Sequence, residues 1–146
     1  MAARTPRPQP RPSDRRYDVV VFGATGFAGR LTAEYLAQVA PPGLRWAIAG
    51  RSEGKLAALR DDLAVIDPAL GDLALVKADV GDDASLRSLA ESTRVVITTV
   101  GPYQFYGEEL LAACVAQGTD YFDLCGEPVW MRQMIDKYDA AAKASG

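Results

Sequence analysis

The sequence predicts an α/β fold built on a doubly wound parallel sheet. Short, continuous apolar runs alternate along the chain with longer segments in which apolar residues recur at helical spacing. Continuous apolar runs are typical of parallel strands that are buried on both faces, and helices are the usual connection between such strands. A glycine-rich turn directly after the first apolar run agrees with this class of fold.

Five apolar runs are the predicted strands, at residues 19–22, 46–49, 73–76, 95–100 and 121–124. Right-handed crossovers through the intervening helices, with the glycine-rich turn at the first strand, predict the spatial strand order 3-2-1-4-5. The chain ends where a sixth strand is expected.

Helical spacing of apolar residues follows each predicted strand. The first four helices are indicated by Ala28, Leu31, Tyr35 and Val39, by Leu56, Leu59, Leu63 and Ile66, by Leu86 and Leu89, and by residues 110–115. The last helix is expected to begin near Glu127, because Pro128 suits a first helical position, and to place Trp130, Met134, Tyr138 and Ala141 on one face.

The two ends of the chain differ in composition. Residues 1–16 contain five arginines, four prolines and one acidic residue with few apolar groups, which predicts a disordered basic tail. Residues 17–146 are acidic overall and predict one folded domain, a poor electrostatic match for nucleic acid. With no apolar run long enough for a membrane span or a secretory signal, we expect a cytoplasmic protein. The basic tail is interpreted as a solvated leader, and peripheral contact with anionic lipid is the alternative.

The residue inventory limits the chemistry. The chain has no histidine, which excludes Ser-His-Asp and Cys-His nucleophiles and removes the commonest metal ligand, so no metal site is expected. Cys114 and Cys125 do not form a disulfide framework. Cys125 has no histidine partner and is interpreted as a small buried residue.

The turn after the first strand reads FGATGFAGR, residues 22–30, with glycines three positions apart. Such a turn lets the backbone approach a pyrophosphate, and the N-terminus of the next helix favours an anion. This context indicates a Rossmann-type dinucleotide site, for which we predict contacts from Gly23, Thr25, Gly26, Phe27, Ala28 and Gly29. A purely structural glycine turn is the alternative.

The end of the second strand predicts which dinucleotide binds. NAD sites usually place an acidic residue there, whereas this chain has Arg51, followed by Ser52 and Lys55. These side chains are suited to a 2′-phosphate, which predicts NADP(H). The alternative is that Arg51 is an ordinary surface residue and that Ser52 is a helix N-cap.

Later strand ends supply further candidates. Asp79 and Val80 are expected near the adenine, with an ordinary loop acid as the alternative for Asp79, and Val100, Gly101, Pro102 and Tyr103 are expected beside the nicotinamide. Tyr103 and Tyr106 are weak candidates for a proton donor, and packing is the commoner role. The catalytic residues are otherwise unknown.

Two carboxylates flank Cys125. Asp123 and Glu127 follow the fifth strand, and such a pair can act as an acid/base device. The simpler interpretation is that Glu127 caps a helix.

Three stretches carry a family resemblance: GATGFAGRLTAEYL, AGRSEGKLAAL and VVITTVGPYQFYGEELLAACVAQGTDYFDLCGEPVWMRQMI. Over residues 17–146 the chain resembles the N-terminal domain of the saccharopine dehydrogenase-like oxidoreductases, closest to the trans-acting enoyl reductase type. The resemblance implies NADP(H) and a longer enzyme with a second domain for substrate and for homodimer formation. The enoyl reductase type implies reduction of a carbon–carbon double bond in a lipid precursor carried by a polyketide synthase. Cys125 stands where relatives often have threonine.

Other functions on the same fold require particular residues, and the sequence can be checked for them. No tyrosine is followed by lysine four positions later, which disfavours a complete short-chain dehydrogenase. A methyltransferase is disfavoured by the missing acid after the second strand. An NADP-sensing protein without turnover is the alternative that the fold leaves open. We expect this chain, as one part of a longer oxidoreductase, to be inactive alone.

Overall fold

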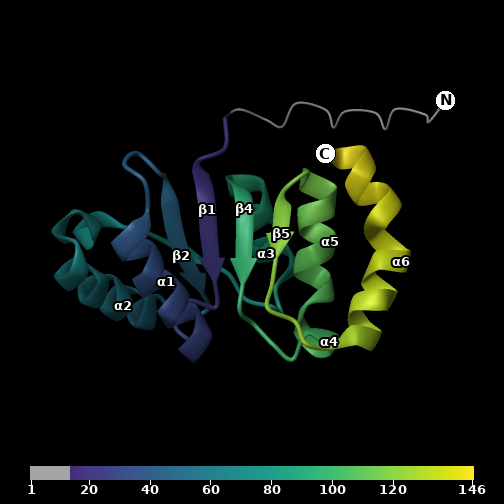
Figure 1. Cartoon of the computed structure of the whole chain (residues 1–146), viewed down its shortest axis with the longest axis horizontal. Coiled ribbons are helices and arrows are strands. Elements are labelled where there is room, and N and C mark those ends of the chain that lie inside the picture. Colours follow the sequence, from purple (N-terminus) through teal and green to yellow (C-terminus); the bar gives the residue numbers. More distant parts are fainter. Residues whose placement is uncertain (1–13) are drawn as a thin grey trace.

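Parallel strands form one five-stranded sheet in the predicted order, β3-β2-β1-β4-β5. The computed structural model describes residues 14–146 (Figure 1). The strands are β1 (Tyr17–Phe22), β2 (Trp46–Gly50), β3 (Ala74–Lys77), β4 (Thr93–Thr98) and β5 (Asp120–Phe122). The predicted fold class and strand order are therefore confirmed.

Within residues 14–146, six α-helices and one short 3₁₀-helix connect or follow the strands. They are α1 (Phe27–Val39), α2 (Glu53–Ile66), η1 (Pro68–Asp72), α3 (Asp83–Ser92), α4 (Tyr103–Tyr106), α5 (Glu108–Gln117) and α6 (Pro128–Ser145). The short elements η1 and α4 were not predicted, because four or five residues carry too little periodicity to be detected.

Each face of the sheet is covered by its own helices, as the doubly wound fold requires. Leu56 and Leu63 of α2 pack with Ala33 of α1 against Val21 and Ile48 on one face. On the other face the side chains of Val20, Ala47 and Val96 pack against α3 and α5 through Leu86, Leu89, Leu110 and Cys114. Helix α6 packs against α5 at the β5 side of the sheet (Figure 1).

Helix α1 buries a different face from the one that its apolar residues indicate. Gly29 and Ala33 are buried, whereas Leu31 and Tyr35 are 52% and 63% exposed. The cause is steric: a Cβ atom on Gly29 would lie only 2.1 Å from Gly23 O, so the glycine side of the helix is pressed against the turn. The periodicity predicted the helix correctly but not its orientation.

Arg15, which precedes the predicted domain boundary after residue 16, contacts the folded residues. Residues 1–13, which hold most of the predicted tail, lie outside the described residues. Arg15 is only 7% exposed, and its guanidinium donates to Ala90 O at 3.2 Å and also to Glu91 O and Gln117 O. Arg15 therefore belongs to the domain, where it links the ends of α3 and α5.

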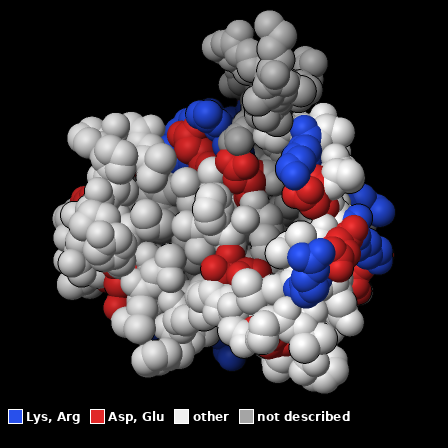
Figure 2. Space-filling model, turned by 45° about the vertical axis from the view of Figure 1, so that its right-hand side comes forward, with Lys and Arg blue, Asp and Glu red and all other residues white. Residues whose placement is uncertain are grey.

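The last helix also departs from its predicted face. Trp130 and Met134 are buried and Tyr138 is half-buried, but Ala141 is exposed. The exposed side of α6 carries the ion pairs Arg132–Asp136 and Lys143–Asp139. Figure 2, which brings this side of the molecule forward, shows basic side chains beside acidic ones rather than a continuous basic patch. None of the helices within residues 14–146 has the length and apolar character that a membrane crossing requires.

Candidate functional site

The carboxyl ends of the central strands surround a cavity of about 410 Å³. This is the edge at which open α/β sheets bind ligands. Most of its lining residues were predicted from the sequence: Gly23, Thr25, Gly26, Arg51, Asp79, Val80, Val100, Gly101 and, as a catalytic candidate, Tyr106. Phe22, Gly50, Ala78 and Thr99 line it too and were not predicted.

The three glycines of the turn have different structural roles. Gly23 adopts a φ of +81°, and a Cβ atom there would lie 2.7 Å from Val100 Cγ2. Gly29 allows α1 to lie directly against the turn. Gly26 is exposed, and a Cβ atom there would meet only Gly23 O, at 3.4 Å. Two glycines are therefore required by packing, whereas the third leaves open space at the start of α1.

The N-terminus of α1 is suited to an anion. Gly26 is the N-cap residue, and no side chain in the described part of the chain caps this helix. By contrast, Ser52 and Asp82 cap α2 and α3 with their own oxygen atoms. The first N–H groups of a helix have no partner within it and carry the positive end of the helix dipole, so a pyrophosphate fits this position.

The residue directly after β2 is basic rather than acidic. Arg51 is exposed and lines the cavity. Ser52 Oγ accepts from Lys55 N at 3.4 Å, so the predicted alternative of a helix cap is observed for Ser52. Ser52 and Lys55 do not line the cavity, but they lie within one helical turn of Arg51. A role for them at a 2′-phosphate stays a prediction.

Asp79 lies after β3 at the rim of the same cavity. Its Oδ1 accepts from Gly81 N at 3.0 Å, while its own N–H donates to Ser85 Oγ at 3.0 Å. These bonds fix the turn before α3. An adenine contact from Asp79 stays a prediction.

The segment after β4 contacts the glycine turn directly. Thr99 Oγ1 lies 3.3 Å from Phe22 O and 3.2 Å from Gly23 O, so its hydroxyl donates to the backbone of the turn. The sequence predicts that this strand continues to residue 100, but β4 ends at Thr98. Thr99 directly follows β4, and the pairing of β4 with β1 is what brings its hydroxyl to the glycine turn.

The two tyrosine candidates have different environments. Tyr103 is buried, and its hydroxyl donates to Thr98 O at 3.2 Å and accepts from Leu124 N at 3.4 Å. Burial raises the pKa of Tyr103. Proton transfer from Tyr103 would require this packing to open, whereas Tyr106 lines the cavity and is 43% exposed.

The groups around Cys125 are all held by local contacts. Asp123 Oδ1 accepts from Cys125 N at 3.0 Å, and Cys125 Sγ accepts from Glu127 N at 3.3 Å. Burial raises the pKa of the Cys125 thiol. Glu127 is the N-cap residue of α6, but its side chain does not cap that helix. Both its carboxylate oxygens instead accept the first N–H groups of α4, so the predicted helix-capping role is found at α4. The described residues contain no group of three or more acidic, cysteine or histidine side chains placed to hold a metal ion.

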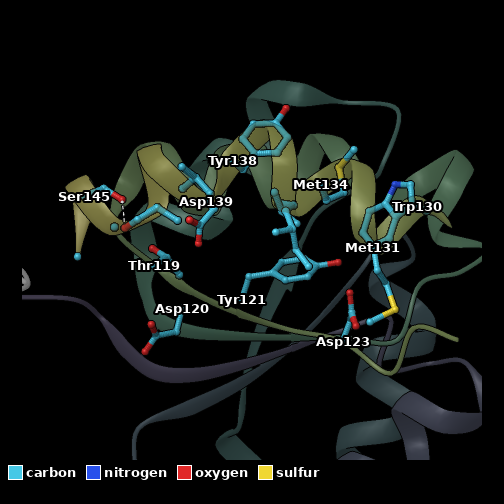
Figure 3. Close-up of a pocket in the computed structure, with 16 residues that line it drawn as sticks. Thr119, Asp120, Tyr121, Asp123, Trp130, Met131, Met134, Tyr138, Asp139 and Ser145 are labelled. Carbon is cyan, nitrogen blue, oxygen red and sulfur yellow. Dashed lines mark hydrogen bonds between the residues drawn. The ribbon is translucent and has the colours of Figure 1, made fainter. Parts of the chain in front are cut away.

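A second cavity of about 360 Å³ lies between β5 and α6 (Figure 3). Tyr121 and Asp123 approach it from the strand side, and Trp130, Met131 and Met134 approach it from α6. It shares no lining residue with the cavity at the glycine turn. None of the residues predicted to bind the cofactor lines this second cavity, whereas Asp123 of the predicted carboxylate pair does.

Solved structures share this fold. Saccharopine dehydrogenase (L-Glu forming) from Saccharomyces cerevisiae superimposes with a TM-score of 0.64 at 19% identity, over 81% of this chain and 24% of that chain. AtPrR2, solved with NADP+ and (+)pinoresinol, superimposes with a TM-score of 0.56 at 23% identity, over 89% of this chain and 48% of that chain. Both likenesses concern the fold.

Curated relatives are much more similar in sequence. A Mycobacterium tuberculosis (strain ATCC 25618 / H37Rv) protein whose name assigns it provisionally as a trans-acting enoyl reductase is 47% identical over 136 residues, covering 90% of this chain and 30% of the relative. A trans-acting enoyl reductase of Mycobacterium leprae is 44% identical over 135 residues, covering 92% of this chain and 31% of the relative. The chain thus spans about 30% of the length of the curated relatives it matches. The family model of the saccharopine dehydrogenase NADP-binding domain matches residues 19–146. The chain belongs to this family, and its cofactor is NADP(H).

Proposed function

We propose that this chain is the NADP(H)-holding domain of an enoyl reductase that reduces a carbon–carbon double bond in a carrier-bound lipid or polyketide precursor. The observation that carries the proposal is the 47% identity, over 90% of the chain, to a relative named as a trans-acting enoyl reductase. The relatives' names favour an enzyme over a sensor that binds NADP without turnover.

Three features of the described residues support cofactor binding at the glycine turn. The open N-terminus of α1 beside Gly26 is suited to the pyrophosphate, and Arg51 is suited to the 2′-phosphate. The segment from Thr99 to Gly101 lines the part of the cavity that lies towards β4, where the nicotinamide half is expected. When bound, the cofactor supplies the hydride, and the protein supplies orientation and electrostatics.

Three broader expectations belong to the same proposal. The substrate is a small molecule or a lipid carried by a partner protein. The whole enzyme forms a homodimer through a second domain, and it works in the cytoplasm with the basic tail available for contact with anionic lipid. These follow from the family resemblance and from the composition of residues 1–16.

Turnover tests the proposal. We expect a longer protein containing this domain to oxidise NADPH in the presence of an α,β-unsaturated thioester, and to leave the corresponding saturated thioester, a ketone and an imine unchanged. We expect the 146-residue chain to bind NADPH without turnover, since loss of preorganised positioning alone costs about 7–11 kcal/mol. Turnover of the ketone or the imine in place of the unsaturated thioester contradicts the enoyl reductase assignment. Full activity of the short chain would place the catalytic site within these residues.

A further inference from the structure

We infer that Glu127 is a positioning residue that fixes the nicotinamide side of the cofactor cavity from outside it. The inference rests on the proposed cofactor site. Glu127 Oε1 accepts from Tyr103 N at 2.7 Å, and Oε2 accepts from Gln104 N at 2.9 Å. One carboxylate thus holds the first two N–H groups of α4, although it lies 24 positions away from Tyr103 in the sequence. Hydrogen bonds to an ionised acceptor are roughly twice as strong as those between neutral groups.

Helix α4 also contacts Leu124, in the segment after β5, and Trp130 of α6. The Tyr103 hydroxyl bridges Thr98 O and Leu124 N, and its ring packs on Trp130 with 5.8 Å between the ring centroids. At the other end of α4, a Cβ atom on Gly107 would lie 2.7 Å from Trp130 Cζ2. Helix α4 therefore has little freedom to move relative to the start of α6.

The residues just before α4 are those that line the cavity. Val100 and Gly101 lie between Thr99, whose hydroxyl donates to the glycine turn, and Tyr103, whose N–H is held by Glu127. The cavity wall on the β4 side is thus anchored at both ends. Because Thr99 bonds to the turn itself, Glu127 is the charged group that fixes the end leading into α4.

The strand order determines which half of the cofactor this wall faces. Arg51 and Asp79 follow β2 and β3, on one side of the central strand β1, whereas the wall follows β4 on the other side. A dinucleotide that crosses the sheet at this switch point places its adenosine half over β2 and β3 and its nicotinamide half beside β4. Loss of Glu127 should therefore weaken contacts to the nicotinamide half and spare those to the 2′-phosphoadenosine half.

Two ligands separate this role from a general structural one. NADPH contains both halves, while adenosine 2′,5′-bisphosphate contains only the 2′-phosphoadenosine half. Calorimetric titration of each ligand into the unmodified chain, Glu127→Ala and Glu127→Gln gives the affinities, and circular dichroism on heating reports folding. Glu109→Gln is the matched control, because Glu109 is an exposed glutamate in the first turn of α5.

We expect Glu127→Ala to bind NADPH about tenfold more weakly, equivalent to about 1.4 kcal/mol, and to bind adenosine 2′,5′-bisphosphate within about twofold of the unmodified chain. Glu127→Gln keeps one acceptor oxygen and should show a smaller loss in the same direction, which carries the test if the alanine variant does not fold. Unchanged NADPH affinity in a folded variant, or equal losses for both ligands, overturns the inference. If the unmodified chain binds neither ligand, the cofactor site itself is wrong.

Discussion

Substitution of Gly26 should weaken cofactor binding, whereas substitution of Gly29 should destabilise the fold. The Gly26 substitution is the sharper test of the phosphate site. A Cβ atom on Gly26 meets only Gly23 O, at 3.4 Å, and the residue has an ordinary φ of −80°. Gly26→Val should therefore fold, with a loss of at most about 1 kcal/mol from the poorer N-cap. The added methyl groups enter the open space at the start of α1, where the pyrophosphate is expected.

The expected loss of binding follows from the bonds that the side chain blocks. A hydrogen bond from a helix N–H group to a charged acceptor contributes about 1.5–3 kcal/mol, so losing two costs about 3–6 kcal/mol. This corresponds to about a hundredfold weaker NADPH binding or more. Gly29→Ala should instead reduce the stability of the fold. Its Cβ atom would lie 2.1 Å from Gly23 O, and we expect the free energy of unfolding to fall by about 3 kcal/mol or more.

Calorimetric titration with NADPH and thermal unfolding followed by circular dichroism measure the two effects separately. Gly71→Val is the matched control, because Gly71 is exposed and lies in η1, outside the cavity lining, and a Cβ atom there would meet no other atom within 4 Å. A folded Gly26→Val variant with unchanged NADPH affinity would show that the phosphate does not bind at this turn. An unfolded one would refute the steric reasoning.

Three further predictions concern charge and burial. Arg51→Ala should reduce the preference for NADPH over NADH by about ten- to a hundredfold, as measured by titration of both cofactors, because a charge-assisted contact contributes about 1.5–3 kcal/mol; equal affinities in the unmodified chain would contradict it. Hydrogen bonds from Lys137 and Tyr138 lower the pKa of Glu108 from its ordinary value, so this carboxylate stabilises the fold above its ordinary pKa and ceases to do so as the pH falls through the lowered value. Denaturant titrations of Glu108→Gln should thus show a stability loss at neutral pH that disappears in acid, and a pH-independent loss would refute this. Burial raises the pKa of Cys114 to about 12. Iodoacetamide at pH ~8, near the ordinary thiol pKa, should therefore label Cys114 only after unfolding. Rapid labelling of Cys114 itself in the folded chain would show that this thiol is accessible.

The fold and most of the cavity could be predicted because their signals are local. A buried parallel strand is a continuous apolar run, and the glycine spacing and the missing acid after β2 are read directly from neighbouring positions. Arg51 and Gly26 were found in this way, and both line the cavity. Thr99 was missed because a threonine at a strand end has many possible roles, and only the position of β4 beside β1 brings its hydroxyl to the glycine turn.

Which helix the Glu127 side chain caps was beyond the sequence, for a different reason. Its position before Pro128 places it at the start of the last predicted helix. The carboxylate instead binds α4, whose four residues have no detectable periodicity. A contact between an unpredicted element and a residue with a plausible local role leaves no trace in spacing or composition.

The orientation of α1 shows how a binding motif can override apolar periodicity. The larger side chains Leu31, Tyr35 and Val39 recur at helical spacing and predict the helix, yet each is at least half exposed. The steric requirement at Gly29 outweighs them, because a backbone contact at 2.1 Å cannot be relieved by a change of rotamer. Once Gly29 faces the turn, the residues four and eight positions later, Ala33 and Ala37, must face the sheet, and both are small enough to do so. The small residues, and not the large ones, therefore determine which side of α1 is buried.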